Sequence, residues 1–262
     1  MKLTRLLGAI LLLTVCALAA AAQVAAAPKT VLYYSCTKGF RHSTCWYAKP
    51  IITEMGEKSG AFRVICTEDP RVINREVLAG VSCVVFGNPT GSSLDDAGKA
   101  ALLDFVRGGG GFVGIHAATD GNYDWPEYRD LIGGWFDGHP WSEQVTVRIE
   151  VPDHPACQPV PSPWVINDEI YQHRDWSRDD VCVLMSLDPN GTDFTKDGIK
   201  RADRDFGICW CKQFGQGRSI YTALGHREEV WDDPVYQAHL LNCILWAMGD
   251  LEGTCQPHPK PQ

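Results

Sequence analysis

Short, continuous apolar runs divide the first half of the chain, and segments with helical spacing lie between them. Runs of this kind are typical of strands covered on both faces, as in a parallel sheet. They predict strands at Val31–Cys36, Phe62–Cys66, Val81–Phe86 and Phe112–His116. Apolar residues that recur at helical intervals predict helices at Tyr47–Lys58, Leu94–Val106 and Pro234–Met248.

The pattern changes in the second half of the chain. Residues Gln144–Val151 alternate between polar and apolar side chains, as an edge or antiparallel strand does. Three later apolar runs predict strands at Val181–Leu187, Gly207–Phe214 and Ser219–Leu224. Alternating strands and helices predict an α/β fold, with a doubly wound, mostly parallel sheet flanked by helices and an antiparallel extension.

The N-terminal residues have the composition of a secretory signal. Lys2 and Arg5 precede a short apolar run, Leu6–Leu18, and an alanine-rich stretch follows it. The run is short for a membrane span, and no stop-transfer pattern follows it. We therefore expect residues 1–27 to be a signal peptide, residues 28–250 to form one domain, and residues 251–262 to be an irregular tail. The mature protein would be secreted or periplasmic.

The net charge of the chain bears on which classes of partner it can bind. It has 24 basic and 32 acidic residues and a net charge of −8, whereas nucleic-acid binding needs basic patches. No apolar run after the signal is long enough to span a membrane. Nucleic acid and a membrane span are therefore not expected, and the oligomeric state is left open.

The chain is rich in cysteine, with 11 in all. The signal peptide would remove Cys16, and the even number that remains in an exported protein predicts disulfides without giving their connectivity. Cys209 and Cys211 would share a face of a strand, so each is expected to pair with a partner elsewhere. The chain has no C-x-x-C motif, so the cysteines do not predict a zinc site.

A histidine ends the fourth predicted strand. Ligands of open α/β sheets bind beyond the carboxyl ends of the strands, where a histidine suits acid–base chemistry or metal binding. His116 has this position, His226 repeats it after a later strand, and His42 follows the first strand. A lone histidine would more often be packed or at the surface, but two in one sheet favour a site. The glycines at 108–111 precede their strand, so they form no phosphate loop and no nucleotide cofactor is expected.

Other candidate residues lie in loops or after apolar runs. His139 is in a loop rich in glycine and tryptophan, where the alternative is a turn residue. Asp168 and Glu169 would face opposite sides of an extended run, so only one can face a pocket; the alternative is a solvated acidic turn. His239 is expected to pack in the core and His173 to lie at the surface. No G-x-S-x-G motif marks a serine nucleophile.

Seven short segments occur in an order that is characteristic of one family. They are Phe40-Arg41-His42, Gly109–His116, Leu131–Pro140, Asp153-His154-Pro155, Asp168–Tyr171, Phe214–Arg218 and Ala223–His226. With these segments, the chain from Val31 to about Gly249 resembles the ThuA-like family, named for trehalose utilisation.

The resemblance implies a fold similar to that of class I glutamine amidotransferases, which is flavodoxin-like. It implies that His116 replaces the amidotransferase cysteine, so glutaminase activity is not expected. It also implies a sugar-related role, on keto-sugars made by partner oxidoreductases. The chain departs from the family in its cysteine content and in Gln172-His173 after Tyr171.

The leading hypothesis is an exported carbohydrate-processing enzyme, an isomerase, lyase or hydrolase, that acts on keto-sugars or their glycosides. Acid–base or metal-assisted proton transfer needs a carboxylate together with a histidine or metal that polarises a carbonyl group. Glu169 would move protons, while the other catalytic candidates bind substrate oxygens or a divalent metal; they are His116, His139 and His226. Zinc is the expected ion, on His116 and His226. The expected substrate contacts are His42, Trp135, Tyr171 and Asp120.

Two alternatives stay open. A non-catalytic sugar-binding module would use the tryptophans, whose faces suit sugar rings, and would tolerate loss of the carboxylate; core filling is the commoner role of a tryptophan. A glycoside hydrolase needs two opposed carboxylates. Because Asp168 and Glu169 are adjacent, Asp120 would have to supply the second one.

Overall fold

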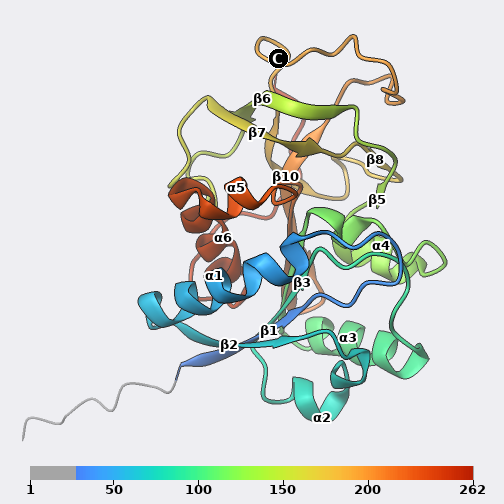
Figure 1. Cartoon of the computed structure of the whole chain (residues 1–262), viewed down its shortest axis with the longest axis vertical. Helices are drawn as coiled ribbons and strands as arrows, with labels where there is room; N and C mark the ends of the chain where they lie inside the picture. Colours follow the sequence, from blue (N-terminus) through green and yellow to red (C-terminus); the bar gives the residue numbers. More distant parts are fainter. Residues whose placement is uncertain (1–27, 262) are drawn as a thin grey trace, which may run out of the picture.

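The computed structural model describes residues 28–261 (Figure 1). Its centre is a nine-stranded sheet with the strand order β2-β1-β3-β4-β11-β10-β9-β6-β7. The first five strands in this order are parallel. They are β2 (Phe62–Thr67), β1 (Lys29–Tyr34), β3 (Cys83–Gly87), β4 (Gly111–Ile115) and β11 (Gly217–Thr222). The predicted signal peptide, residues 1–27, lies outside the described residues.

The other four strands of the large sheet form an antiparallel extension. They are β10 (Gly207–Phe214), β9 (Cys182–Leu187), β6 (Trp141–Ile149) and β7 (Trp164–Ile170). In Figure 1, β6 and β7 cross the upper part of the molecule, whereas β1 and β2 lie in its lower part. A separate two-stranded sheet pairs β5 (Trp135–Phe136) with β8 (His173–Arg174).

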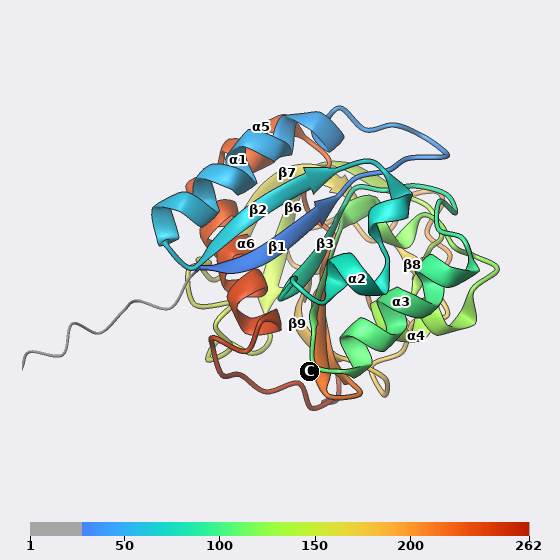
Figure 2. The same cartoon turned by 90° about the horizontal axis from the view of Figure 1, so that it is seen from below.

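Helices cover both faces of the parallel strands (Figure 2). One face carries α1 (Thr44–Ser59), α5 (Glu228–Asp232) and α6 (Pro234–Ala247). The other carries α2 (Arg75–Leu78), α3 (Asp96–Arg107) and α4 (Pro126–Ile132). Single turns of 3₁₀ helix, η1 and η2, span Pro70–Val72 and His116–Thr119. Every residue of β3 and β4 is buried, as expected for parallel strands between two helical layers.

The sequence predictions for the fold are largely confirmed. All eight predicted strands and all three predicted helices are present, with ends shifted by a few residues, and the α/β sheet is flanked by helices. The sheet is mixed: it has the predicted parallel part and the predicted antiparallel extension, with four parallel and four antiparallel ladders. Strand β7 was not predicted, because a carboxylate, Asp168, occupies one of its buried positions.

The predicted disulfides are not present in this structure. Every cysteine between residues 28 and 261 is a free thiol, and most are buried. Two of them donate to carbonyl oxygens of the core, Cys45 to that of Asn88 and Cys157 to that of Leu184. These cysteines therefore act here as small core residues rather than as crosslinks.

The histidines outside the candidate site are more buried than the sequence predicted. His173 was expected at the surface, but it lies in β8 with its Nε2 atom 3.3 Å from the Tyr221 hydroxyl. Burial lowers the pKa of His173 to about 3. His239 lies on α6 and packs in the protein core, as predicted. No helix between residues 28 and 261 is both long and apolar enough to span a membrane.

Candidate functional site

The three strand-end histidines meet at one edge of the sheet. His42 follows β1, His116 follows β4 and His226 follows β11, and these strands belong to one run of neighbouring parallel strands. Since parallel strands end at the same edge, their following loops converge. The ring centroid of His42 lies 5.3 Å from that of His116 and 5.1 Å from that of His226.

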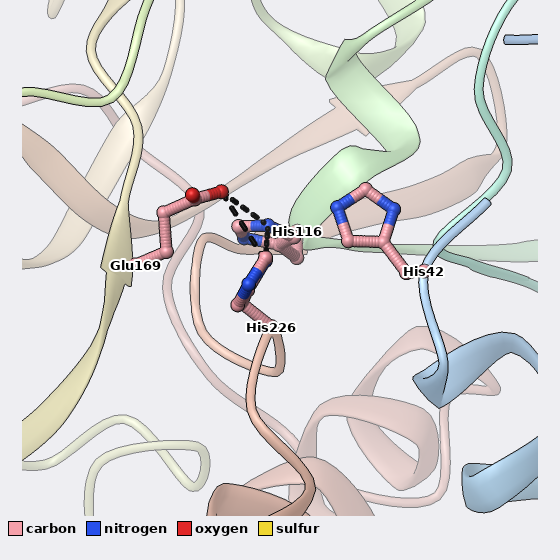
Figure 3. Close-up of side chains that lie close together, drawn as sticks. All are labelled: His42, His116, Glu169 and His226. Atoms are coloured by element: carbon pink, nitrogen blue, oxygen red, sulfur yellow. Dashed lines mark hydrogen bonds and ion pairs between the residues drawn. The ribbon is translucent and has the colours of Figure 1, made fainter. Parts of the chain in front are cut away.

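His116 sits at an abrupt junction between β4 and η2. Its φ of 41° is in the left-handed region, which is uncommon for a residue other than glycine. Strained backbone of this kind persists where surrounding contacts hold it, and it often marks a functional site. Here the Tyr221 hydroxyl donates to the carbonyl oxygen of His116 at 2.8 Å. The side chain is fully buried and points toward the other two imidazoles (Figure 3).

The carboxylate of Glu169 completes the group. Glu169 and Asp168 lie on opposite faces of β7, as expected for an extended segment. Figure 3 shows Glu169 facing His116 and His226, while His42 lies on the far side of the two rings. We call His42, His116, Glu169 and His226 the histidine cluster; the ligand atoms of all four lie within 4.8 Å of one another.

Three atoms that can bind a metal converge in this cluster. His116 Nδ1 lies 2.8 Å from the carbonyl oxygen of Ala223, which can only accept, so Nδ1 carries the proton. In a neutral ring, Nε2 of His116 then presents a lone pair. That atom is 3.2 Å from His226 Nδ1 and 3.4 Å from Glu169 Oε2, and the last two atoms are 3.2 Å apart. Such a triangle needs a proton or a cation among its atoms.

A divalent metal fits this triangle. Nitrogen and oxygen ligands lie about 2.0–2.2 Å from zinc, and at tetrahedral angles they are therefore about 3.3–3.6 Å from one another. Two imidazoles and one carboxylate are a common donor set for catalytic zinc, which keeps a further position for water or substrate. The hydrogen bond from His116 to the Ala223 carbonyl is the usual outer contact of a metal-binding imidazole.

The charges of the cluster also favour a cation. Burial would raise the pKa of Glu169, but its contacts with His116 and His226 outweigh burial and hold that pKa well below its ordinary range. Burial, followed by repulsion from the same two histidines, lowers the pKa of His42 to about 3. At neutral pH Glu169 is therefore ionised and His42 is neutral. The Nδ1 atom of His42 is buried without a hydrogen-bond partner.

A pocket of about 410 Å³ opens above the cluster. It is lined by Phe40, His42, Asp120, Phe136, His139, Glu169, Tyr171 and His226. His139 is half exposed, and its Nδ1 atom lies 3.5 Å from the second carboxylate oxygen of Glu169. The Tyr171 ring packs 4.0 Å from the His116 ring and 4.3 Å from that of Phe136. The pocket therefore combines aromatic side chains with ionisable groups.

Comparison with known proteins agrees with this fold. The family profile for ThuA, described as trehalose utilisation, matches residues 30–247. The chain belongs to the ThuA family. No curated protein matches it by sequence.

Solved structures of ThuA-like proteins are similar to this chain. The match to one from Bacteroides uniformis has a TM-score of 0.70 and 26% identity, and it covers 87% of this chain and 94% of the other. The match to one from Parabacteroides merdae has a TM-score of 0.66 and 18% identity, and it covers 88% of this chain and 98% of the other. A β-galactosidase from Bacillus circulans shares the fold with a TM-score of 0.55 and 13% identity, over 88% of this chain and 32% of the other.

Among the predicted substrate contacts, the structure of this ThuA-family protein brings all but one to the pocket. His42, Asp120 and Tyr171 line it, whereas Trp135 does not. Successive side chains of a strand face opposite sides, and the neighbouring Phe136 lines the pocket instead. Trp135 packs against Tyr123, with their ring centroids 6.1 Å apart.

Two buried polar residues beside the cluster have roles that the sequence did not indicate. Asp168, for which a solvated turn was the alternative, is fully buried and binds the loop that carries His226. Asn88 follows β3 and is also fully buried. Its only signal in the sequence is its position, because it ends a strand next to those that precede the histidines. An asparagine before a proline otherwise looks like a turn residue.

A second group of metal-binding residue types lies between β10 and α6. Cys209, His239 and Cys243 have their ligand atoms within 4.8 Å of one another, and all three are fully buried. We call them the cysteine cluster. Its imidazole has two other partners, the Ala156 carbonyl oxygen at 2.8 Å from Nδ1 and the Thr222 hydroxyl at 3.3 Å from Nε2.

Proposed function

We propose that this ThuA-family protein is a carbohydrate-processing enzyme that binds zinc through His116, Glu169 and His226 and acts on keto-sugars or their glycosides. The convergence of three potential ligand atoms at 3.2–3.4 Å from one another carries this proposal. When bound there, a divalent cation polarises a carbonyl or hydroxyl oxygen of a substrate and lowers the pKa of bound water.

The protein's own side chains supply the other requirements of the reaction. His139 and Asp120 face the pocket, so they can exchange a proton with a carbon or oxygen atom of a bound sugar. Glu169 directs one oxygen atom toward the imidazoles of His116 and His226 and the other toward His139, which it orients. The aromatic wall of Tyr171 and Phe136 suits the apolar face of a sugar ring.

The charge of Glu169 argues against a glycoside hydrolase with a carboxylic acid and a carboxylate base. A general acid needs a raised pKa so that it holds its proton, whereas contacts with the histidines lower the pKa of Glu169. The β-galactosidase named above shares only the fold with this chain. Glutaminase activity is not part of the proposal, because the resemblance to class I glutamine amidotransferases implies that His116 stands where those enzymes carry their cysteine.

Export is part of the proposal. The basic, apolar and alanine-rich order of residues 1–27 supports it. Sequencing the N-terminus of the protein recovered from its native host tests it. A mature chain that begins near residue 28 is expected, and a chain that keeps residues 1–27 in the cytoplasm would contradict export.

The experiment for the activity is proton exchange. The protein is incubated with zinc and a panel of keto-sugars and their glycosides in D₂O, and deuterium at the carbon beside the carbonyl is followed by NMR. Wild type should catalyse exchange or bond cleavage, and Glu169→Gln should abolish it. The matched control is Glu54→Gln, at an exposed position of α1, which should behave as wild type. Sugar binding by wild type without any turnover would favour the non-catalytic module instead.

A further inference from the structure

One buried side chain contacts all three segments that carry the histidines. Asn88 Nδ2 donates to the Thr44 hydroxyl at 2.6 Å and to the Gly225 carbonyl oxygen at 3.0 Å. Its Oδ1 atom accepts from the backbone N–H of Ala117 at 3.2 Å. Thr44 begins α1 just after His42, Ala117 follows His116, and Gly225 precedes His226.

These partners fix the orientation of the amide. The Gly225 carbonyl can only accept and the Ala117 N–H can only donate, so Nδ2 and Oδ1 cannot be exchanged. Only an amide side chain of this length offers both a donor and an acceptor to these partners from one position. Aspartate would lose the donor and place a charge against the Gly225 carbonyl oxygen, because its carboxylate accepts only.

The place of Asn88 in the fold explains how one side chain contacts three segments. It follows β3, which lies between β1 and β4 in the sheet, so it stands between the loops after those strands. Its φ of 56° is left-handed, a conformation that asparagine tolerates better than most residues. The backbone turns there, and the side chain remains fully buried. Asn88 does not line the pocket.

Asp168 holds one of the same segments from the other side. Its carboxylate accepts from the N–H of Gly225 at 2.7 Å and from that of Arg227 at 3.0 Å. Burial raises the pKa of Asp168, and these N–H groups offset part of the cost of its charge. Gly225 is thus bound at its N–H by Asp168 and at its carbonyl by Asn88. The loop that carries His226 is held from both sides.

We propose that Asn88 is the positioning residue of the histidine cluster: it sets the spacing of His42, His116 and His226 through the backbone beside each of them. It acts through these segments and touches neither the pocket nor the substrate. Its effect on metal binding rests on the proposed function above, whereas its effect on the spacing of the imidazoles does not.

The test uses two substitutions at this position in the full chain. Asn88→Asp keeps the shape and removes the donor, and Asn88→Gly removes the amide but suits the left-handed backbone. Zinc affinity is measured by competition with a chromophoric chelator. We expect it to fall about 10–100-fold in both variants, the usual effect of losing an outer contact of a metal site. The matched control is Asn242→Asp on α6, which loses the hydrogen bond from its amide to the Pro155 carbonyl oxygen and should stay within about twofold of wild type.

A second measurement separates this inference from the proposed function. Crystal structures of wild type and Asn88→Gly give the distance between His116 Nε2 and His226 Nδ1, which is 3.2 Å here. Loss of this contact in the variant alone supports the positioning role, even if wild type binds no zinc and the proposed function fails. An unchanged contact, or wild-type zinc affinity in a folded Asn88 variant, overturns it.

Discussion

The histidine cluster and the cysteine cluster contain similar chemical groups in different surroundings. In the histidine cluster, three potential ligand atoms lie 3.2–3.4 Å from one another, and a pocket of about 410 Å³ lies above them. In the cysteine cluster, both nitrogens of His239 have a hydrogen-bond partner and no member is exposed. Burial, followed by the contact with Cys243, raises the pKa of the Cys209 thiol.

This difference separates a metal site from core packing. A metal ligand must offer a lone pair that no other group uses, and the ligand set must be reachable. In the histidine cluster, the candidate ligand atoms His116 Nε2, His226 Nδ1 and Glu169 Oε2 contact one another, so a metal ion would replace those mutual contacts, and the pocket reaches the cluster. The cysteine cluster would have to give up the Thr222 hydrogen bond and remove the proton of the Cys209 thiol, whose pKa burial raises. Residue type and proximity alone do not distinguish the two groups, whereas the hydrogen-bond partners do.

The largest expected effect is the loss of zinc from one cluster only. Glu169→Gln removes an anionic oxygen from the triangle, so zinc affinity should fall by more than about 100-fold, beyond the effect of an outer contact. Cys209→Ser should bind zinc as wild type does. Elemental analysis and chelator competition measure both. Zinc that persists in Glu169→Gln and disappears in Cys209→Ser would reverse our assignment of the two clusters.

Acid should destabilise the protein through histidines that are buried without charge. Burial lowers the pKa of His173 to about 3 and that of His154 to about 4, from an ordinary value of 6.5. Each takes up a proton on unfolding, so acid favours the unfolded state. Between pH 6.5 and about 4, each should lower the free energy of unfolding by up to about 1.4 kcal/mol per pH unit.

Urea unfolding at several pH values measures this slope. In His173→Phe the slope over that range should be smaller than in wild type, because one proton fewer is taken up. A stability that does not change between pH 6.5 and 4 would show that these histidines are not held neutral in the fold.

A smaller effect is expected on the free energy of unfolding, which substitutions in the two clusters should lower by different amounts. His239→Leu leaves the Ala156 carbonyl without its partner in the core, which should cost about 1–3 kcal/mol. His226→Ala removes a partly exposed imidazole whose contacts lie within the site, and it should cost less than about 1 kcal/mol. Chemical unfolding of both variants without metal gives the comparison. A larger loss for His226→Ala would make the histidine cluster a structural element.

The smallest expected effect concerns the pocket wall. Phe136→Leu should raise KM for a keto-sugar severalfold, because it removes an aromatic face from the pocket. Trp135→Leu should leave KM within about twofold, since Trp135 does not line the pocket. Steady-state kinetics on the two variants tests this. The opposite ranking would return Trp135 to the role that the sequence predicted.

The sequence predicted those parts of the molecule that depend on local pattern. Continuous apolar runs marked the parallel strands, and three histidines were found because each follows a strand. Strand β7 was not predicted, because Asp168 is polar but buried. Only the contacts of its carboxylate with Gly225 and Arg227 explain this burial. Asn88 was missed for the same reason, since its partners come from distant segments. Trp135 was predicted to contact substrate, but Phe136, its neighbour in β5, lines the pocket instead, because adjacent side chains of a strand face opposite sides.

The most direct test is a crystal structure of the zinc-loaded protein with data at the zinc absorption edge. We predict one strong anomalous peak, coordinated by His116 Nε2, His226 Nδ1 and Glu169 Oε2, with the open side of the ion toward the pocket. A peak between Cys209, His239 and Cys243 alone, or no ordered zinc on the three predicted atoms, would contradict the account.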